Sequence, residues 1–272
     1  MNKKKVILSI SGHDPSGGAG LQTDILTSKL FNFHCVSCLT CQTVQTTEKL
    51  YKVASTDQKF FKESLKHLKK STNISGIKVG AIPNKDIALE IINIFSSLDV
   101  PIVIDPIIYA GGGGKFLNKK DLMFCRDLFY PHSDLLTPNH KELKLLSNNK
   151  SEKDSVKFLY DKGIENIYVT GRLNKGTILN SLYSKGTLID ETTSNYLNKD
   201  FHGTGCAIST AILCNLVDKK KLKDACSNSH KFLSKLVQDS FETSGQDILN
   251  FKKWNLLSLI HISEPTRQLA IA

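Results

Sequence analysis

The sequence has no long hydrophobic run, and none of its apolar stretches approaches the ~20 residues that a membrane-spanning helix requires. The first apolar stretch, residues 6–10, follows lysines as in a secretory signal. It is shorter than the roughly 7–15 apolar residues of such signals. We therefore expect a cytoplasmic protein with no membrane partner.

A basic surface rich in aromatic residues is also missing. The formal net charge is +10, yet the lysines fall in small groups such as 3–5, 119–120 and 219–221, and no arginine-rich block occurs. Nucleic acids are held by positive grooves in which aromatic side chains stack on the bases. We therefore expect a solvated lysine surface and no nucleic-acid partner.

The cysteines do not suggest a disulfide framework, because there are seven of them and no secretory signal precedes them. Cys35, Cys38 and Cys41 form a CxxCxxC pattern that is similar to metal-ligand spacing. On a β-strand, a spacing of three places neighbouring cysteines on opposite faces. We therefore expect core cysteines, with a metal cluster as the alternative.

The common nucleotide-binding fingerprints are absent. The glycines of SGHDPSGGAG do not fit the dinucleotide pattern GxGxxG, and GGGGKF lacks the first glycine and the Ser/Thr of a P-loop. A bound nucleotide would have to be held in another way. Residues 111–114 are then interpreted as a mobile loop near a strand end or as a plain flexible loop.

What the sequence does contain is a regular alternation of strands and helices. The expected strands are 6–10, 76–82, 101–105, 134–138 and 165–171, and the expected helices include 18–30 and one N-capped by Asn84. This rhythm predicts an α/β fold with a doubly wound, mainly parallel sheet flanked by helices. We expect a single domain over 1–255 and a tail of uncertain origin over 256–272.

The segment HGTGC precedes an apolar helix. Gly203 and Gly205 allow the backbone to approach an anion, and a helix N-terminus offers unpaired N–H groups and a partial positive charge. Such an end suits a transferring phosphoryl group, and it should make the Cys206 thiol more acidic than a free thiol. The alternative is a buried turn that carries an inert small residue.

Two carboxylates follow predicted strands. Asp105 ends one strand, and Glu142 stands three residues after Asn139 in TPNHKE. The functional interpretation is that both carboxylates arrange Mg²⁺ around nucleotide phosphates. The alternative for Asn139 is a helix cap.

In this order, GHDPSGGAGLQTD, KVG, DP, LTPNHKEL and HGTGC closely resemble the hydroxymethylpyrimidine/phosphomethylpyrimidine kinases of thiamine biosynthesis, which are ribokinase-like proteins. The resemblance extends from about Val6 to Phe241. It implies that Gly12, Asp24 and Gln45 bind the pyrimidine, Gln45 through its side-chain amide. Without it, Asp24 and Gln45 would be interpreted as exposed helix and loop polarity.

The same resemblance implies the phosphoryl-transfer groups. Gly203, Thr204 and Gly205 would form the anion hole, and Cys206 would be the base. A further set of residues would serve the nucleotide and its metal: Asn139 and Thr170 for ATP, and Asp105 and Glu142 for Mg²⁺.

The implied reaction is ATP-dependent phosphorylation of 4-amino-5-hydroxymethyl-2-methylpyrimidine and of its monophosphate, by a homodimer. Thr170 and Arg172 depart from the Lys-Gly-Gly stretch that family members often carry, and the glycine-rich stretch after Asp105 also differs. Pyridoxal kinase is the first alternative, and a non-catalytic pyrimidine-binding sensor is the second.

Overall fold

The computed structural model describes residues 4–95, 98–111, 113–148 and 151–252. The tail expected from residue 256 onward lies outside these ranges. A central sheet is built from nine strands: β1 (Val6–His13), β2 (His34–Gln45), β3 (Leu50–Ser55), β4 (Ile74–Val79), β5 (Ile102–Ile104), β6 (Leu135–Leu136), β7 (Asn166–Asn174), β8 (Thr177–Ser184) and β9 (Thr187–Asn195).

The strand order is β3-β2-β1-β4-β5-β6-β7-β8-β9. The neighbours from β2 through β7 pair in parallel, whereas β3 and the β7–β8–β9 meander pair antiparallel. The chain thus adds β2 and β3 on one side of β1 and then adds β4 to β9 on its other side. This confirms the predicted doubly wound, mainly parallel sheet, whose ligands bind beyond the carboxyl ends of the strands.

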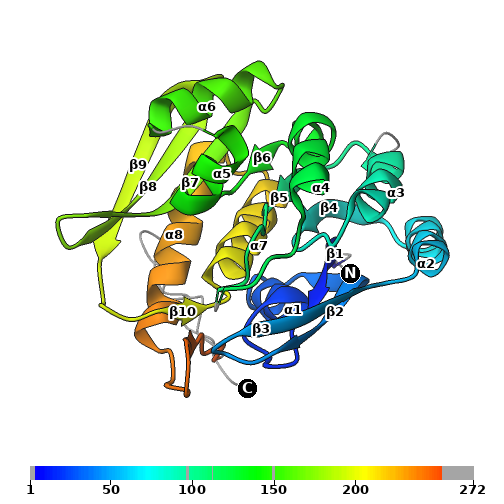
Figure 1. The fold of residues 1–272 in the computed structure, drawn as a ribbon, viewed down its shortest axis with the longest axis horizontal. Coiled ribbons are helices and arrows are strands. Elements are labelled where there is room, and N and C mark those ends of the chain that lie inside the picture. Colours follow the sequence, from blue (N-terminus) through cyan, green and yellow to red (C-terminus); the bar gives the residue numbers. More distant parts are fainter. Residues whose placement is uncertain (1–3, 96–97, 112, 149–150, 253–272) are drawn as a thin grey trace, which may run out of the picture.

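Helices cover both faces of the sheet (Figure 1). They are α1 (Gly20–Leu30), α2 (Gln58–Ser71), α3 (Lys85–Phe95), α4 (Lys119–Phe124), α5 (His140–Ser147), α6 (Glu152–Asp161), α7 (Thr204–Val217) and α8 (Leu222–Gln238). A short second sheet joins β10 (Phe201–His202) to β11 (Asp247–Ile248).

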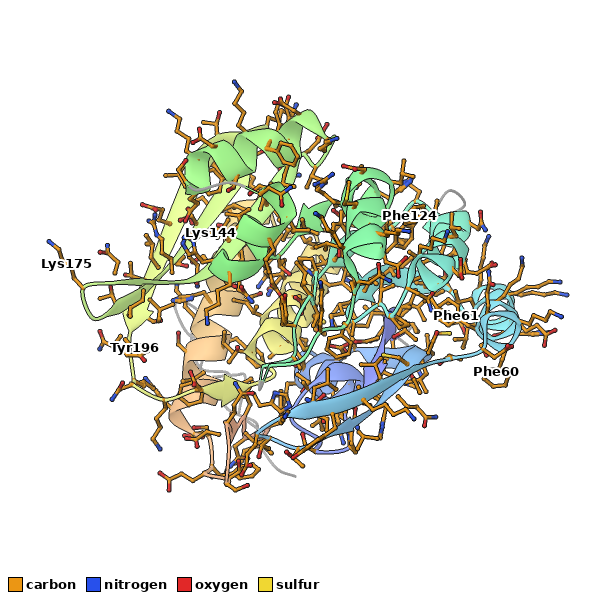
Figure 2. The ribbon with its side chains drawn as sticks, viewed as in Figure 1. Phe60, Phe61, Phe124, Lys144, Lys175 and Tyr196 are labelled. Carbon is orange, nitrogen blue, oxygen red and sulfur yellow. The ribbon has the colours of Figure 1, made fainter. Side chains whose placement is uncertain are left out.

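Alternating strand side chains divide the core into two layers. Leu8 and Ile10 pack into the cluster under α2, α3, α5 and α6, whereas Ile7, which precedes Leu8, packs with α7 and α8 on the other face. On α2 the division falls between neighbours: Phe61 is buried and Phe60 is exposed (Figure 2). Both faces of the central strands are therefore dry, as their near-continuous apolar sequence predicts.

Several local predictions are confirmed. The Asn84 side chain accepts a hydrogen bond from the Ile87 amide at 3.0 Å, so it caps α3 as expected. The predicted strand 165–171 is longer than expected, because its pairing with β8 continues to Asn174. Lys175 lies at the tip of this β7–β8 hairpin (Figure 2).

The CxxCxxC cysteines lie along β2. Cys38 packs into the cluster under α2 and α3, and Cys35 packs against the opposite cluster, so the two point to opposite faces as a strand requires. Among the described residues, no group of three or more His, Cys, Asp or Glu side chains is placed to hold a metal ion. Within the same ranges, no helix combines the length and the apolar character needed to span a bilayer.

Candidate active site

Two cavities adjoin at the carboxyl edge of the sheet. The first, of about 250 Å³, is lined by residues at or beyond the ends of β1, β2, β4, β5, β6 and β7 and by the start of α7. The second, of about 470 Å³, lies between the β7–β9 meander and helices α7 and α8. The cavities share five lining residues: Thr170, Gly171, Phe201, Thr204 and Gly205.

The N-terminus of α7 lies where the two cavities meet. Helix α7 begins at Thr204, after Gly203 with φ of 77°, and no side chain caps its first turn. A side chain at Gly203 would collide with the carbonyl oxygen of Gly18, so only glycine fits this left-handed position. Because almost the whole of α7 is buried, its uncapped amides are held rigidly toward the cavities. The uncapped helix start that the sequence predicts therefore borders both cavities.

The glycine-rich loop after β1 packs directly against this helix start. Thr23 Oγ1 donates to the Gly18 carbonyl at 3.0 Å, and the His202 ring occupies the space that a side chain at Gly18 would fill. The two glycine-rich segments, far apart in sequence, thus form one continuous wall. Gly12, at the end of β1, lines the first cavity as predicted.

Cys206 lines the first cavity, but its predicted acidity is wrong. Its side chain is only 4% exposed, and burial raises the pKa of the thiol to about 12, with the nearby Asp105 and Asp24 charges adding to the effect and Lys78 opposing it. Removing the thiolate from water outweighs the helix N-terminus. In the free site Cys206 is a neutral thiol.

Asp105 and Glu142 both line the first cavity, as predicted. Burial raises the pKa of Asp105 to about 6, although Lys78 opposes it, and burial together with the Asp105 charge raises the pKa of Glu142 to about 8. Asp105 Oδ2 has no hydrogen-bond partner, and a Cβ on Gly205 would lie 3.3 Å from it. An unsatisfied carboxylate oxygen beside a second carboxyl fits a divalent cation, which binds through one or two carboxylates plus phosphate oxygens.

Asn139 and Glu142 also form the capping box of α5. Asn139 Oδ1 accepts from the amides of Lys141 and Glu142 at 2.9 Å, and Glu142 Oε2 accepts from the Asn139 amide at 2.9 Å. Glu142 Oε1 accepts from the Ile108 amide at 3.3 Å. The capping interpretation of Asn139 is thus confirmed, while both side chains still border the cavity.

Asp24 does not line the cavity, so its predicted contact with substrate is wrong. It is fully buried and forms an ion pair with Lys78, whose Nζ lies 2.9 Å from Asp24 Oδ1. Thr210 and Ser9 donate to the two carboxylate oxygens at 2.9 and 2.5 Å. The side chain points from α1 into the layer under α7, where it neutralises a lysine that the sequence reasoning missed.

Gln45, at the end of β2, does line the cavity, as predicted. Its Nε2 lies 3.1 Å from Nε2 of His202, and the same His202 atom lies 2.7 Å from Asp14 Oδ2. Asp14 and His202 were not predicted as site residues, although Asp14 lies in the GHDPSGGAG motif and His202 in the HGTGC motif. Their position in those motifs is the signal that could have identified them.

Thr170 lines both cavities and pairs with Asn139 across an isolated bridge. Arg172 instead forms ion pairs with Glu152 at 3.4 Å and Glu191 at 3.6 Å. It is absent from the lining of both cavities. The departure from Lys-Gly-Gly therefore places Thr170 in the lining of both cavities and leaves Arg172 outside it.

The fold is ribokinase-like. The chain is similar to the structure of a Bacillus subtilis pyridoxal kinase in an ADP complex, with a TM-score of 0.83 and 23% identity over 92% of this chain and 98% of that chain. It is also similar to the phosphomethylpyrimidine kinase structure from Clostridium difficile, with a TM-score of 0.72 and 22% identity over 86% of this chain and 100% of that chain.

The sequence narrows the class further. The phosphomethylpyrimidine kinase family model matches residues 14–249, and the chain belongs to this family. It is 30% identical to a hydroxymethylpyrimidine/phosphomethylpyrimidine kinase of Aquifex aeolicus, over 90% of this chain and 100% of the relative. A kinase of the same description from Haemophilus influenzae is 26% identical over 87% of this chain and 92% of the relative.

Proposed function

We propose that the protein transfers the γ-phosphoryl group of ATP to the 5-hydroxymethyl group of 4-amino-5-hydroxymethyl-2-methylpyrimidine, and then phosphorylates the monophosphate to the pyrophosphate. One observation carries the proposal: a small cavity that contains Gln45 and Cys206 meets a larger cavity at the uncapped N-terminus of α7. The relatives from Aquifex aeolicus and Haemophilus influenzae are named as kinases for these pyrimidines, which supports this choice of substrate.

Each of the two cavities would hold one of the two substrates. The pyrimidine would occupy the first, between Gly12 and Gln45, and the nucleotide would occupy the second, with its phosphates at Thr170, Asn139 and the start of α7. The amides of Gly203, Thr204, Gly205 and Cys206 would face the charge that develops on the phosphoryl oxygens. Loss of one such preorganised donor typically raises a barrier by about 2.7–4 kcal/mol.

Asp105 and Glu142 would hold Mg²⁺, which neutralises polyphosphate charge when bound. The mutual repulsion of these two carboxyls supports the assignment, because a cation between them would favour both ionised forms. Glu142 would contribute without giving up its capping role, since each oxygen accepts only one backbone amide.

Cys206 would accept the proton of the substrate hydroxyl. Because the thiol is neutral in the free site, its own proton must leave first. Lys78 is the neighbouring group whose charge favours the thiolate. The active fraction of enzyme should therefore depend steeply on pH.

The test is ADP release by purified protein with Mg-ATP, with the hydroxymethylpyrimidine, its monophosphate and pyridoxal supplied at equal concentration. Turnover with both pyrimidines supports the proposal. Turnover with pyridoxal alone would show that the substrate is wrongly assigned and that the phosphotransferase assignment is right. ADP at background with all three, together with calorimetric binding of the pyrimidine, would favour a sensor protein.

Cytoplasmic location and a homodimer remain part of the proposal. Light scattering of the purified chain would test the dimer, and a monomeric mass would contradict it.

A further inference from the structure

His202 is buried in the lining of the first cavity and contacts Asp14, in the loop after β1, and Gln45, at the end of β2. Its Nε2 atom lies 2.7 Å from Asp14 Oδ2 and 3.1 Å from Gln45 Nε2. A single ring nitrogen therefore has two neighbours, and its protonation state decides what each neighbour can do.

Asp14 requires a proton on that nitrogen. Its carboxylate also accepts from the amide and hydroxyl of Ser16, at 2.9 and 2.8 Å, and from the Ala19 amide at 3.0 Å. Burial alone would raise the pKa of Asp14, but hydrogen bonds from His202 and Ser16 outweigh burial and lower it. An ionised carboxylate can only accept, so the contact of 2.7 Å needs an N–H on His202 Nε2.

A protonated His202 Nε2 cannot accept from the Gln45 amide. Two N–H groups at 3.1 Å do not hydrogen-bond. Turning the terminal carboxamide by about 180° places its oxygen there instead, where it shares the His202 N–H with the nearer Asp14 carboxylate in a three-centre hydrogen bond. The NH₂ group then turns from His202 toward the cavity that Gln45 lines. The oxygen retains one lone pair for a ligand.

We propose that His202 is a positioning residue that fixes the Gln45 carboxamide with its NH₂ group toward the cavity, so that the site reads a ring nitrogen acceptor beside an exocyclic amine donor. The Asp14 carboxylate fixes His202 in turn. This inference rests on the proposed function for the identity of the ligand, but the orientation of the amide follows from protein contacts alone. The oxygen of Gln45 would accept from the exocyclic amine while its NH₂ donates to the ring nitrogen.

A matched ligand pair tests the specificity. The 4-amino pyrimidine presents a ring acceptor beside an amine donor, and its 4-oxo analogue presents a ring N–H beside a carbonyl acceptor. Calorimetry should show that the wild-type protein prefers the 4-amino compound by about 5- to 150-fold, the range expected for an unmatched buried polar pair. His202→Leu frees the amide to rotate, so the preference should fall to within about threefold.

Three variants separate positioning from damage. His202→Gln keeps an N–H donor and should retain most of the preference for the 4-amino compound. Gln45→Glu removes the NH₂ donor and should weaken binding of that compound. His202→Leu in a Gln45→Met background should cause no further change in the preference. An unchanged preference in His202→Leu, or an equal effect of that change in the Gln45→Met background, would overturn the inference. Unaltered affinity for Mg-ATP controls for general disruption.

The tautomer can be measured without any ligand. In protein labelled with ¹⁵N-histidine, and assigned by comparison with His202→Gln, the Nε2 signal of His202 should show a directly bonded proton. A bare Nε2 would overturn the inference even if the protein phosphorylates pyrimidines. A protonated Nε2 in a protein that binds neither pyrimidine would instead locate the failure in the proposed function.

Discussion

The buried ion pair between Lys78 and Asp24 offers the sharpest test of how the layer under α7 is stabilised. Both side chains are 0% exposed, and Nζ lies 2.9 Å from Oδ1. In Lys78→Met, the Asp24 carboxyl keeps the hydroxyl donors of Ser9 and Thr210 but loses its counter-charge. Breaking a buried pair in this way typically costs about 3–5 kcal/mol.

The loss of the counter-charge should also lower the melting temperature. At pH 7 the melting temperature should drop by roughly 8–16 °C for a chain of this size.

Thermal and urea unfolding followed by far-ultraviolet circular dichroism measure both quantities. Lys78→Met/Asp24→Leu removes the two charges together and should recover part of the loss. Lys59→Met, at an exposed position on α2, is the matched control and should change stability by less than about 0.5 kcal/mol. A loss below about 1 kcal/mol at pH 7 would refute the reasoning.

Three further predictions concern the site. Cys206→Ala should keep the KM for the pyrimidine and lose about 10²–10⁴ in kcat, the range for general-base catalysis, and near-normal steady-state turnover would remove Cys206 from the mechanism. Because burial raises the pKa of Cys206 toward about 12, kcat should keep rising up to at least pH 9, and a plateau below pH 8 would contradict a thiolate base. Glu142 has a raised pKa of about 8, so its ionisation destabilises the fold increasingly from its unfolded value of about 4.3 up to that pH. Glu142→Gln should therefore stabilise the ligand-free protein above pH 8 by more than about 1.4 kcal/mol, while its Mg-dependent turnover falls. Urea unfolding at pH 6 and pH 9 measures the stability, and steady-state assays measure the turnover.

Local signals in the sequence were enough for the parts of the site that depend on backbone conformation. HGTGC predicted an uncapped helix start because glycine at 203 and an apolar helix after it are both local properties, and Gly203 does adopt a positive φ. Asp105, Asn139 and Glu142 were expected at strand ends, and parallel pairing brings the strand ends to one edge.

The second cavity was not predicted from the sequence. Besides β7 and α7, its walls come from β8, β9, α8 and the segment after β9, where Tyr196 lies (Figure 2), and none of these further elements carries a recognisable motif. Their contribution depends on how the antiparallel meander packs over α7 and α8, which is a property of distant contacts rather than of local pattern.

By itself, the sequence determined five of the strands that pair in parallel, the two glycine-rich turns and the family, because periodicity, turn residues and motifs are local properties of the chain. Only the tertiary structure decided the electrostatic roles. Asp24 became a buried counter-ion of Lys78, Cys206 became a neutral thiol, and His202 came to join Asp14 to Gln45. Burial and the charges of residues far away in sequence set protonation and orientation, and both arise only when the layers pack together.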